Sequence, residues 1–364
     1  MYRLINKIEK TPKFGLLAIT LTVTFVLGFV DYVTGTELTF YQFYAIPVMF
    51  AVWFAGRWRS YPIAIISLFF WVADDFYKRN IFGNPLISLW NLLVQMFFFV
   101  LLIEIFSALK LAFKEQKKAE QEKIKNEMKV ARQVQEKLFP QFVPVSSLDF
   151  HGICKTADAV GGDYFDYFKI RNNEIAFAIG DVSGHGLSAA LIMAGLVGFV
   201  RSSASVFNEN LGEFFKRLNN LIFESTAGSN FISFFYGIVR EEDKVFRYIN
   251  AGQNPPMVYR PCTDTFVQLK TGGLLMGIKP DWDYETGTIK LESGDIIILY
   301  TDGITETFNS ENEMFGEERL KYIIKKYYIN TSSEIMDYIL DGLDRFSNRL
   351  PQKDDITLLV IKIN

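Results

Sequence analysis

The first third of the chain is too apolar to fold like an ordinary soluble domain. Four apolar runs follow one another there, at residues 14–30, 40–55, 61–73 and 86–106. A membrane-spanning helix needs about 20 such residues, and the first and last runs approach that length. Because lipid offers no hydrogen bonds to the backbone, runs of this kind are expected to be helical. The sequence therefore predicts an all-α membrane domain of four helices over residues 1–107.

Charged residues beside these runs predict the orientation of the membrane domain. The segment before the first run and the loop with Arg57 and Arg59 are basic, whereas the loop with Asp31 and Glu37 is not. Residues 108–140 hold nine Lys or Arg and five Glu, an excess of four positive charges. By the positive-inside rule, both termini lie in the cytoplasm. The first run lacks a small-residue cleavage site, so we expect an uncleaved, multi-pass protein of the inner (cytoplasmic) membrane.

The membrane domain has two possible roles. Asp74, Asp75 and Glu104 lie at or near membrane depth, where ionisable residues point to function by default. This favours a small sensory domain, but a plain anchor with Glu104 at the level of the inner headgroups explains the same residues.

The composition of residues 108–140 predicts a long exposed helix. The run is charged and contains no Gly, and Pro140 ends it. A mostly apolar series recurs there at alternating steps of four and three, at Ile124, Met128, Ala131, Gln135 and Leu138. This short heptad pattern is compatible with a solvated spacer and with a coiled coil that makes the chain a homodimer.

Residues 141–364 have the pattern of an α+β domain, because strands and helices come in blocks. Strands are expected at residues 150–156, 164–170, 174–182, 231–240, 244–250, 257–259, 295–301 and 356–363. Helices are expected at residues 187–206, 211–224, 317–328 and 333–349. The first of these helices is apolar enough to resemble a fifth span. Its glycines Gly195 and Gly198 and its terminal Arg201 favour a buried core helix instead.

Aspartates stand at the ends of several expected strands. They occur in the fragments 161–166 (GGDYFD), 180–186 (GDVSGHG), 301–303 (TDG) and 354–355 (DD). Asp and Gly are common in turns for conformational reasons alone. Carboxylates collected at one edge would also form a cradle for a hard divalent cation, which prefers oxygen ligands.

These fragments, with 251–256 (AGQNPP), occur in the order and spacing of a known family. Over residues 141–364 the chain resembles the SpoIIE-like (sporulation-type) branch of the metal-dependent PPM protein phosphatases. The resemblance implies two packed antiparallel sheets flanked by helices. One departure is Gln253, where the family usually has His.

The resemblance also implies a site with two Mn²⁺ or Mg²⁺ ions. Its ligands would be Asp163, Asp181, the Val182 carbonyl, Asp302 and Asp354, with Asp163 and Asp181 as the catalytic pair. Asp354 is preferred over Asp355 by family position alone. Residues expected beside the ligands are Asp166, His185, Gly303 and Asp355.

The implied activity is hydrolysis of phosphoserine or phosphothreonine on a regulatory protein, such as an anti-sigma-factor antagonist, in signal transduction. The alternative is an inactive PPM fold that acts as a membrane adaptor by contact. A net charge of −3 implies no global surface for nucleic acid. Two histidines are too few for a multi-histidine zinc site, and two cysteines fit a reducing compartment.

Overall fold

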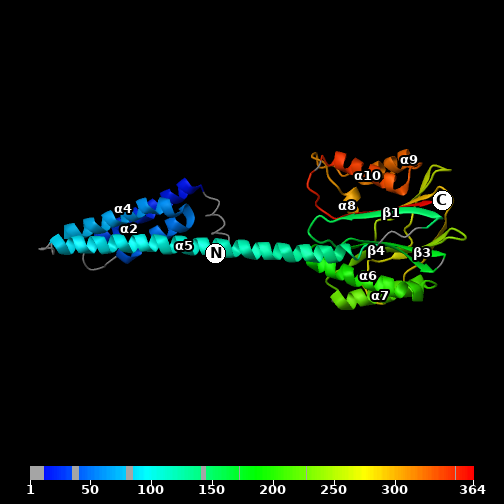
Figure 1. The fold of residues 1–364 in the computed structure, drawn as a ribbon, viewed down its shortest axis with the longest axis horizontal. Coiled ribbons are helices and arrows are strands. Elements are labelled where there is room, and N and C mark those ends of the chain that lie inside the picture. Colours follow the sequence, from blue (N-terminus) through cyan, green and yellow to red (C-terminus); the bar gives the residue numbers. More distant parts are fainter. Residues whose placement is uncertain are drawn as a thin grey trace. The chain divides into compact units, whose positions relative to one another are not determined.

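The chain forms two compact units, Met1–Ile124 and Lys125–Asn364 (Figure 1). The computed structural model describes residues 12–34, 41–78, 85–140, 145–171, 173–226, 228–348 and 350–364.

The described part of the first unit consists of helices. They are α2 (Lys13–Thr34), the 3₁₀ turn η1 (Tyr41–Tyr44), α3 (Ala45–Phe50), the π turn η2 (Ala51–Ala55), α4 (Arg57–Lys78) and α5 (Pro85–Glu136). Their common core is apolar, with Val48, Ala51, Ile63 and Ile103 almost fully buried. Many apolar side chains on the outer faces are exposed, among them Phe29 and Trp90. A helical bundle surrounded by lipid needs apolar side chains both in its core and on its outer faces, as found here.

Each of the four predicted runs is helical, but the boundaries differ from those expected. The second run is divided into η1, α3 and η2, and the third extends to Lys78. The fourth run and the linker form one continuous helix, α5, because neither Gly nor Pro occurs after Pro85 until Pro140. By length and composition, α2 and the part of α5 from Leu89 are apolar enough to cross a membrane.

Two charged residues of the first unit have partners within the bundle. Asp31, expected in a loop, lies inside α2, is buried, and accepts a hydrogen bond from the Tyr44 hydroxyl at 3.3 Å. Glu104 forms an ion pair with Arg57 at 2.8 Å and accepts a hydrogen bond from Tyr61. Glu104 therefore holds the start of α4 against α5, which favours a structural role. The side chains of Asp74 and Asp75 lie outside the described residues.

The second unit is a sandwich of two sheets (Figure 1). The first sheet has the order β1-β11-β10-β6-β7, with β1 (Leu148–Lys155), β6 (Met257–Arg260), β7 (Thr265–Gln268), β10 (Ile296–Tyr300) and β11 (Ile356–Ile363). The second has the order β2-β3-β4-β5-β8, with β2 (Tyr164–Arg171), β3 (Glu174–Val182), β4 (Ile232–Arg240), β5 (Val245–Ala251), β8 (Gly272–Gly273) and β9 (Gly287–Lys290), which also pairs with β5. The pairing is antiparallel apart from the short parallel contact between β5 and β8.

Helices cover both outer faces of the sandwich. The helices α6 (Leu187–Phe207) and α7 (Leu211–Thr226) lie on the β2–β5 sheet, and α9 (Gly316–Tyr327) and α10 (Ser332–Phe346) lie on the β1–β11 sheet. Three apolar layers result, one between the sheets and one under each pair of helices. The predicted α+β fold with two packed sheets is confirmed.

By length and composition alone, the helix α6 could also span a membrane. It instead packs Met193, Leu196 and Val200 against the β2–β5 sheet, as the core-helix interpretation predicted. The short strands β7, β8 and β9 were not predicted. They have four, two and four residues and mostly exposed faces, so they carry little hydrophobic pattern.

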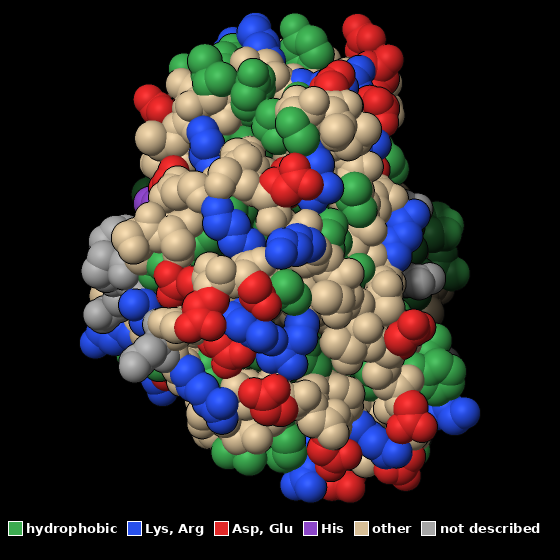
Figure 2. Space-filling view, turned by 90° about the vertical axis from the view of Figure 1, so that its right-hand side faces the viewer, with side chains coloured by type: hydrophobic (Ala, Val, Ile, Leu, Met, Phe, Trp, Pro, Cys, Tyr) green, Lys and Arg blue, Asp and Glu red, His purple; other side chains and the backbone are tan. Residues whose placement is uncertain are grey.

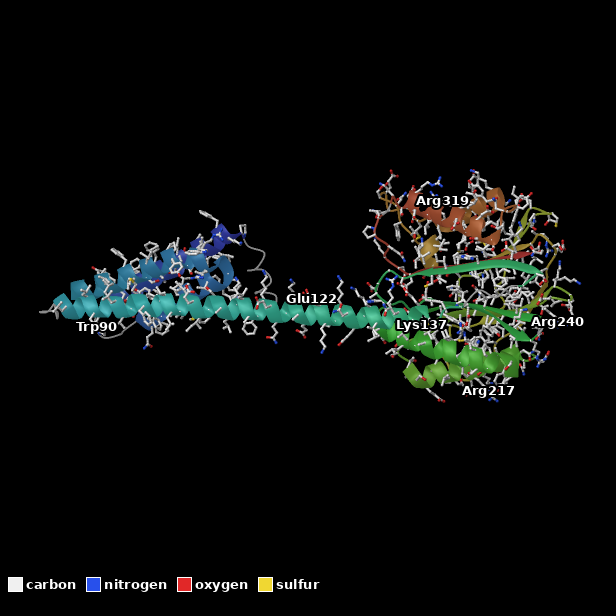
Figure 3. All side chains as sticks on the ribbon, viewed as in Figure 1. Trp90, Glu122, Lys137, Arg217, Arg240 and Arg319 are labelled. Atoms are coloured by element: carbon white, nitrogen blue, oxygen red, sulfur yellow. The ribbon has the colours of Figure 1, made fainter. Side chains whose placement is uncertain are left out.

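The surface of the second unit carries charges of both signs. On the face in Figure 2, Lys and Arg side chains lie among Asp and Glu side chains, and the blue groups near its centre have red groups beside them. Along α5 near Glu122, side chains project away from the helix on several sides (Figure 3).

Candidate active site

Two aspartates of the β2–β5 sheet meet at one edge of the sandwich. The antiparallel register places Tyr164 of β2 opposite Gly180 of β3, so Asp163 and Asp181 lie at the same end of these strands. Asp163 is 2% exposed, and Asp181 is the penultimate residue of β3.

Two further aspartates reach this edge from the other sheet. Tyr300, the last residue of β10, pairs with Leu358 of β11, so the segments before β11 and after β10 are neighbours. Asp302 begins the short helix α8 (Asp302–Thr305), and Asp354 lies two residues before β11. Asp163, Asp181, Asp302 and Asp354 are called the rim carboxylates below.

Two threonines join the sheets at the rim. The hydroxyls of Thr301 and Thr357 both donate to Asp163 Oδ2, at 2.9 and 2.6 Å. These bonds fix the Asp163 side chain across the gap between the sheets. Sequence reasoning missed both threonines, although Thr301 begins the TDG fragment and Thr357 follows the DD fragment by two residues.

The rim carboxylates repel one another. Burial raises the pKa of Asp163 well above its usual value, and the charge of Asp181 adds to this rise. Burial, followed by the charges of Asp302, Asp354 and Asp355, raises the pKa of Asp181 to about 7. Burial and Asp354 likewise raise the pKa of Asp302. A divalent cation at the rim would relieve this repulsion.

The remaining geometry also fits a divalent cation. A Cβ at Gly162 would come within 2.8 Å of the Val182 carbonyl oxygen, so glycine leaves that oxygen accessible. The donors are all oxygens, as Mg²⁺ and Mn²⁺ prefer. Within the described residues, no three His, Cys, Asp or Glu side chains converge closely enough to hold one ion. The rim is thus an open set of carboxylates whose chemistry fits a cation, not a closed coordination shell.

The neighbours Asp354 and Asp355 have different surroundings. Asp355 accepts hydrogen bonds from the backbone N–H groups of Ala157 at 2.7 Å and Gly162 at 3.0 Å. It therefore fastens the loop that leads to Asp163. Asp354 is exposed, and its Oδ1 accepts a local bond from the Asp355 N–H. This difference favours Asp354 as the residue free to bind a cation.

Gly303 and His185, which were both expected beside the ligands, have different roles. A Cβ at Gly303 would lie 1.9 Å from the Asp355 carbonyl oxygen, so only glycine allows α8 to pack against the start of β11. His185 has a side chain that is 93% exposed and lies 3.8 Å from Asp158. It sits between Gly184 and Gly186, which both have positive φ. This placement favours a turn residue over a general acid.

Asp166 has a structural role. Its fully buried carboxylate accepts hydrogen bonds from Arg201 Nε at 2.8 Å and from the Tyr164 hydroxyl at 2.9 Å. Arg201 also donates to the Leu138 carbonyl oxygen at 2.9 Å. Asp166 and Arg201 therefore join β2, α6 and the segment after α5.

The end of α5 is also fastened to the loop before Asp163. The buried Gln135 donates from Nε2 to the Gly161 carbonyl oxygen at 2.7 Å and accepts from the Gly161 N–H at 3.2 Å. Leu138 packs against the core under α6. Two positions of the predicted heptad thus contact the chain's own second unit and are not available to a partner helix.

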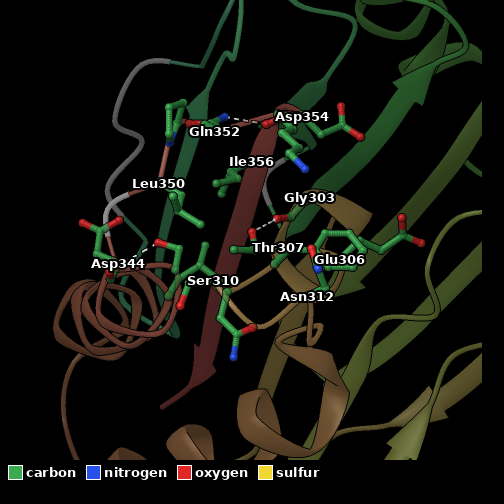
Figure 4. Close-up of a pocket in the computed structure, with 16 residues that line it drawn as sticks. Gly303, Glu306, Thr307, Ser310, Asn312, Asp344, Leu350, Gln352, Asp354 and Ile356 are labelled. Carbon is green, nitrogen blue, oxygen red and sulfur yellow. Dashed lines mark hydrogen bonds between the residues drawn. The ribbon is translucent and has the colours of Figure 1, made fainter.

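A cavity of about 500 Å³ adjoins the rim (Figure 4). Gly303 and Asp354 form its wall on the rim side. The opposite wall comes from the segment after α8 and the end of α10, including Asn312 and Asp344. Such a mixed polar and apolar cavity beside carboxylates can receive part of a polypeptide substrate.

Comparisons with known proteins agree with this fold. The family model "Stage II sporulation protein E (SpoIIE)" matches residues 171–364. The phosphoserine phosphatase RsbU of Bacillus subtilis (strain 168) is 31% identical over 264 residues, which cover 72% of this chain and 78% of RsbU.

Solved structures agree in fold. The SiaA-PP2C domain of Pseudomonas aeruginosa superimposes with a TM-score of 0.59 at 18% identity, over 68% of this chain and 99% of that domain. The PP2C phosphatase domain of SpoIIE from Bacillus subtilis, with a fragment of its regulatory domain, gives 0.52 at 20% identity, over 61% of this chain and 64% of that one. The chain belongs to the SpoIIE family, and its second unit is a phosphatase domain of the PP2C (PPM) class.

Proposed function

We propose that the chain is a membrane-bound phosphatase that removes phosphate from serine or threonine of a regulatory protein, using two divalent cations. The observation that carries the proposal is the rim, where the strand ends of two sheets bring together four carboxylates, and where burial and neighbouring carboxylates raise the pKa of Asp181 and Asp302. Asp163, Asp181, Asp302, Asp354 and the Val182 carbonyl would hold Mn²⁺ or Mg²⁺.

The chain's own residues account for the architecture that this chemistry needs. Divalent ions bound here would polarise the phosphoryl group and lower the pKa of water. Thr301 and Thr357 orient Asp163, and Asp355 fixes the loop on which it stands. The cavity beside Asp354 would take the polypeptide that flanks the phosphorylated residue.

The substrate is proposed from resemblance. RsbU is named a phosphoserine phosphatase, and the family resemblance implies a phosphorylated antagonist of an anti-sigma factor. The apolar helices α2 and α5 support a membrane location, with the phosphatase unit in the cytoplasm. The exposed Ile124 and half-exposed Met128, one turn apart on α5, support a homodimer paired through this helix.

The test is hydrolysis of a phosphoserine protein by the full chain in detergent, with Mn²⁺ or with a chelator. We expect activity only with the cation, and a loss of at least about 100-fold in Asp181→Asn, because catalysis here depends on metal electrostatics. Asp337→Asn, the same change on the exposed face of α10, should behave like the wild type. Chelator-resistant activity would contradict the metal mechanism, and a folded but inactive wild type would favour the adaptor alternative.

A further inference from the structure

The loop between β5 and β6 crosses from one sheet to the other, and Gln253 is its second residue. Gln253 is 5% exposed. The Asn250 side chain holds its backbone, accepting from Gln253 N–H at 2.8 Å and donating to its carbonyl oxygen at 3.1 Å. The Gln253 side chain is therefore presented from a fixed backbone position.

The amide of Gln253 bridges the two sheets. Its Oε1 accepts a hydrogen bond from the Ser233 hydroxyl, and its Nε2 donates to the Tyr300 carbonyl oxygen at 3.3 Å. A carbonyl oxygen can only accept, so Tyr300 fixes which end of the amide faces which sheet.

Both ends of this bridge lie next to rim carboxylates. Ser233 of β4 is the register partner of Asp181, and its hydroxyl lies 3.5 Å from the Asp181 carbonyl oxygen. Tyr300 ends β10, directly before Thr301 and Asp302. Gln253 thus connects the strand end that carries Asp181 with the strand end that leads to Asp302.

We propose that Gln253 is a positioning residue that sets the separation between Asp181 and Asp302 for cation binding. The inference rests on the proposed function and adds a residue to it. Asp181 and Asp302 stand at the two strand ends that Gln253 joins, and like charges held close together repel each other. A bridge between their strand ends opposes this repulsion, and a neutral amide does so without adding charge. An imidazole also offers one donor and one acceptor, so histidine is the conservative replacement.

The experiment compares Gln253→Met and Gln253→His with the wild type, as full chains in detergent. Methionine keeps the length of the side chain and removes both hydrogen bonds. We expect the Mn²⁺ dissociation constant, measured by calorimetry, to rise about 10-fold in Gln253→Met, as for other residues that orient metal ligands. The Mn²⁺ concentration for half-maximal activity should rise equally, while kcat at saturating Mn²⁺ changes little. Gln253→His should recover most of the affinity.

The matched control is Gln268→Met in β7 of the same sandwich, which removes an amide hydrogen bond to Glu317 of α9. It should leave Mn²⁺ binding unchanged. The proposal is overturned if Gln253→Met binds Mn²⁺ like the wild type, or if Gln268→Met weakens binding as much. A wild type that neither binds Mn²⁺ nor hydrolyses phosphoserine overturns the proposed function as well, whereas an active wild type matched by Gln253→Met overturns the bridge alone.

Discussion

At the scale of single residues, the chain gives adjacent carboxylates different tasks. Asp354 is exposed beside the rim, whereas Asp355 is bonded to backbone N–H groups of the loop before Asp163. The backbone bonds of Asp355 contribute to folding, while the surroundings of Asp354 leave it free to bind a ligand.

Replacing each aspartate by asparagine should separate these tasks. Asp354→Asn removes a charged ligand, so we expect a loss of Mn²⁺-dependent activity by orders of magnitude with little change in the Tm of the metal-free protein. Asp355→Asn puts an amide donor near backbone donors, which should lower the free energy of unfolding by about 1–3 kcal/mol. For a unit of this size that lowers the Tm by roughly 2–12 °C. Calorimetric Tm and hydrolysis rates check both. A normal Tm for Asp355→Asn, with metal dependence lost, would reverse the assignment.

At the scale of elements, α5 belongs to both units. Its N-terminal part is an apolar segment of the first unit, and its C-terminal end packs against the sandwich of the second unit. Gln135 and Leu138 contact the phosphatase unit, so they cannot also form a seam with a partner helix. The upstream positions Ile124 and Met128 remain exposed or half-exposed. Pairing of two α5 helices along the predicted heptad must therefore use this upstream part.

We expect the double variant Ile124→Lys/Met128→Lys to convert a dimer into a monomer, because buried lysines in an apolar seam are strongly unfavourable. Light scattering of the full chain in detergent measures the mass. Asn126→Lys/Gln133→Lys adds the same charge at exposed polar positions off this seam and should remain dimeric. If the first variant also remains dimeric, α5 does not pair through this face.

At the scale of the whole molecule, the predicted topology places the basic segments on one side of the membrane. The structure brings the Arg57 end of α4 against Glu104 of α5 and joins Lys110 to the Trp53 carbonyl oxygen. The Arg57 loop thus lies level with the part of α5 that leads into the linker. This arrangement is compatible with both lying in the cytoplasm, where the positive-inside rule places them.

Labelling with a membrane-impermeant maleimide checks the topology in a chain whose Cys154 and Cys262 are replaced by serine. A cysteine at Val33, which is 65% exposed at the far end of α2, should react in intact cells. A cysteine at Trp58, which is 78% exposed, should react only after permeabilisation. Reaction at Trp58 in intact cells would invert the orientation.

The sequence alone determined the elements whose information is local. The apolar runs, the linker without Gly or Pro, and the aspartates at strand ends each depend on neighbouring residues, so helices, strands and the candidate carboxylates could be predicted. It could not predict β7, β8 and β9, whose short exposed strands depend on the sheet that receives them.

Only the tertiary structure decided which side chains meet. Asp163 bonds to threonines 138 and 194 residues away, and Gln253 reaches strands of both sheets. Such contacts depend on how two sheets pack, which no local pattern encodes. The same packing gave Asp355 its backbone partners and left Asp354 exposed. It also buried one face of α6, a helix whose composition would have allowed it to span a membrane. Local residue patterns therefore supplied the chemical groups of the site, and long-range packing set their partners.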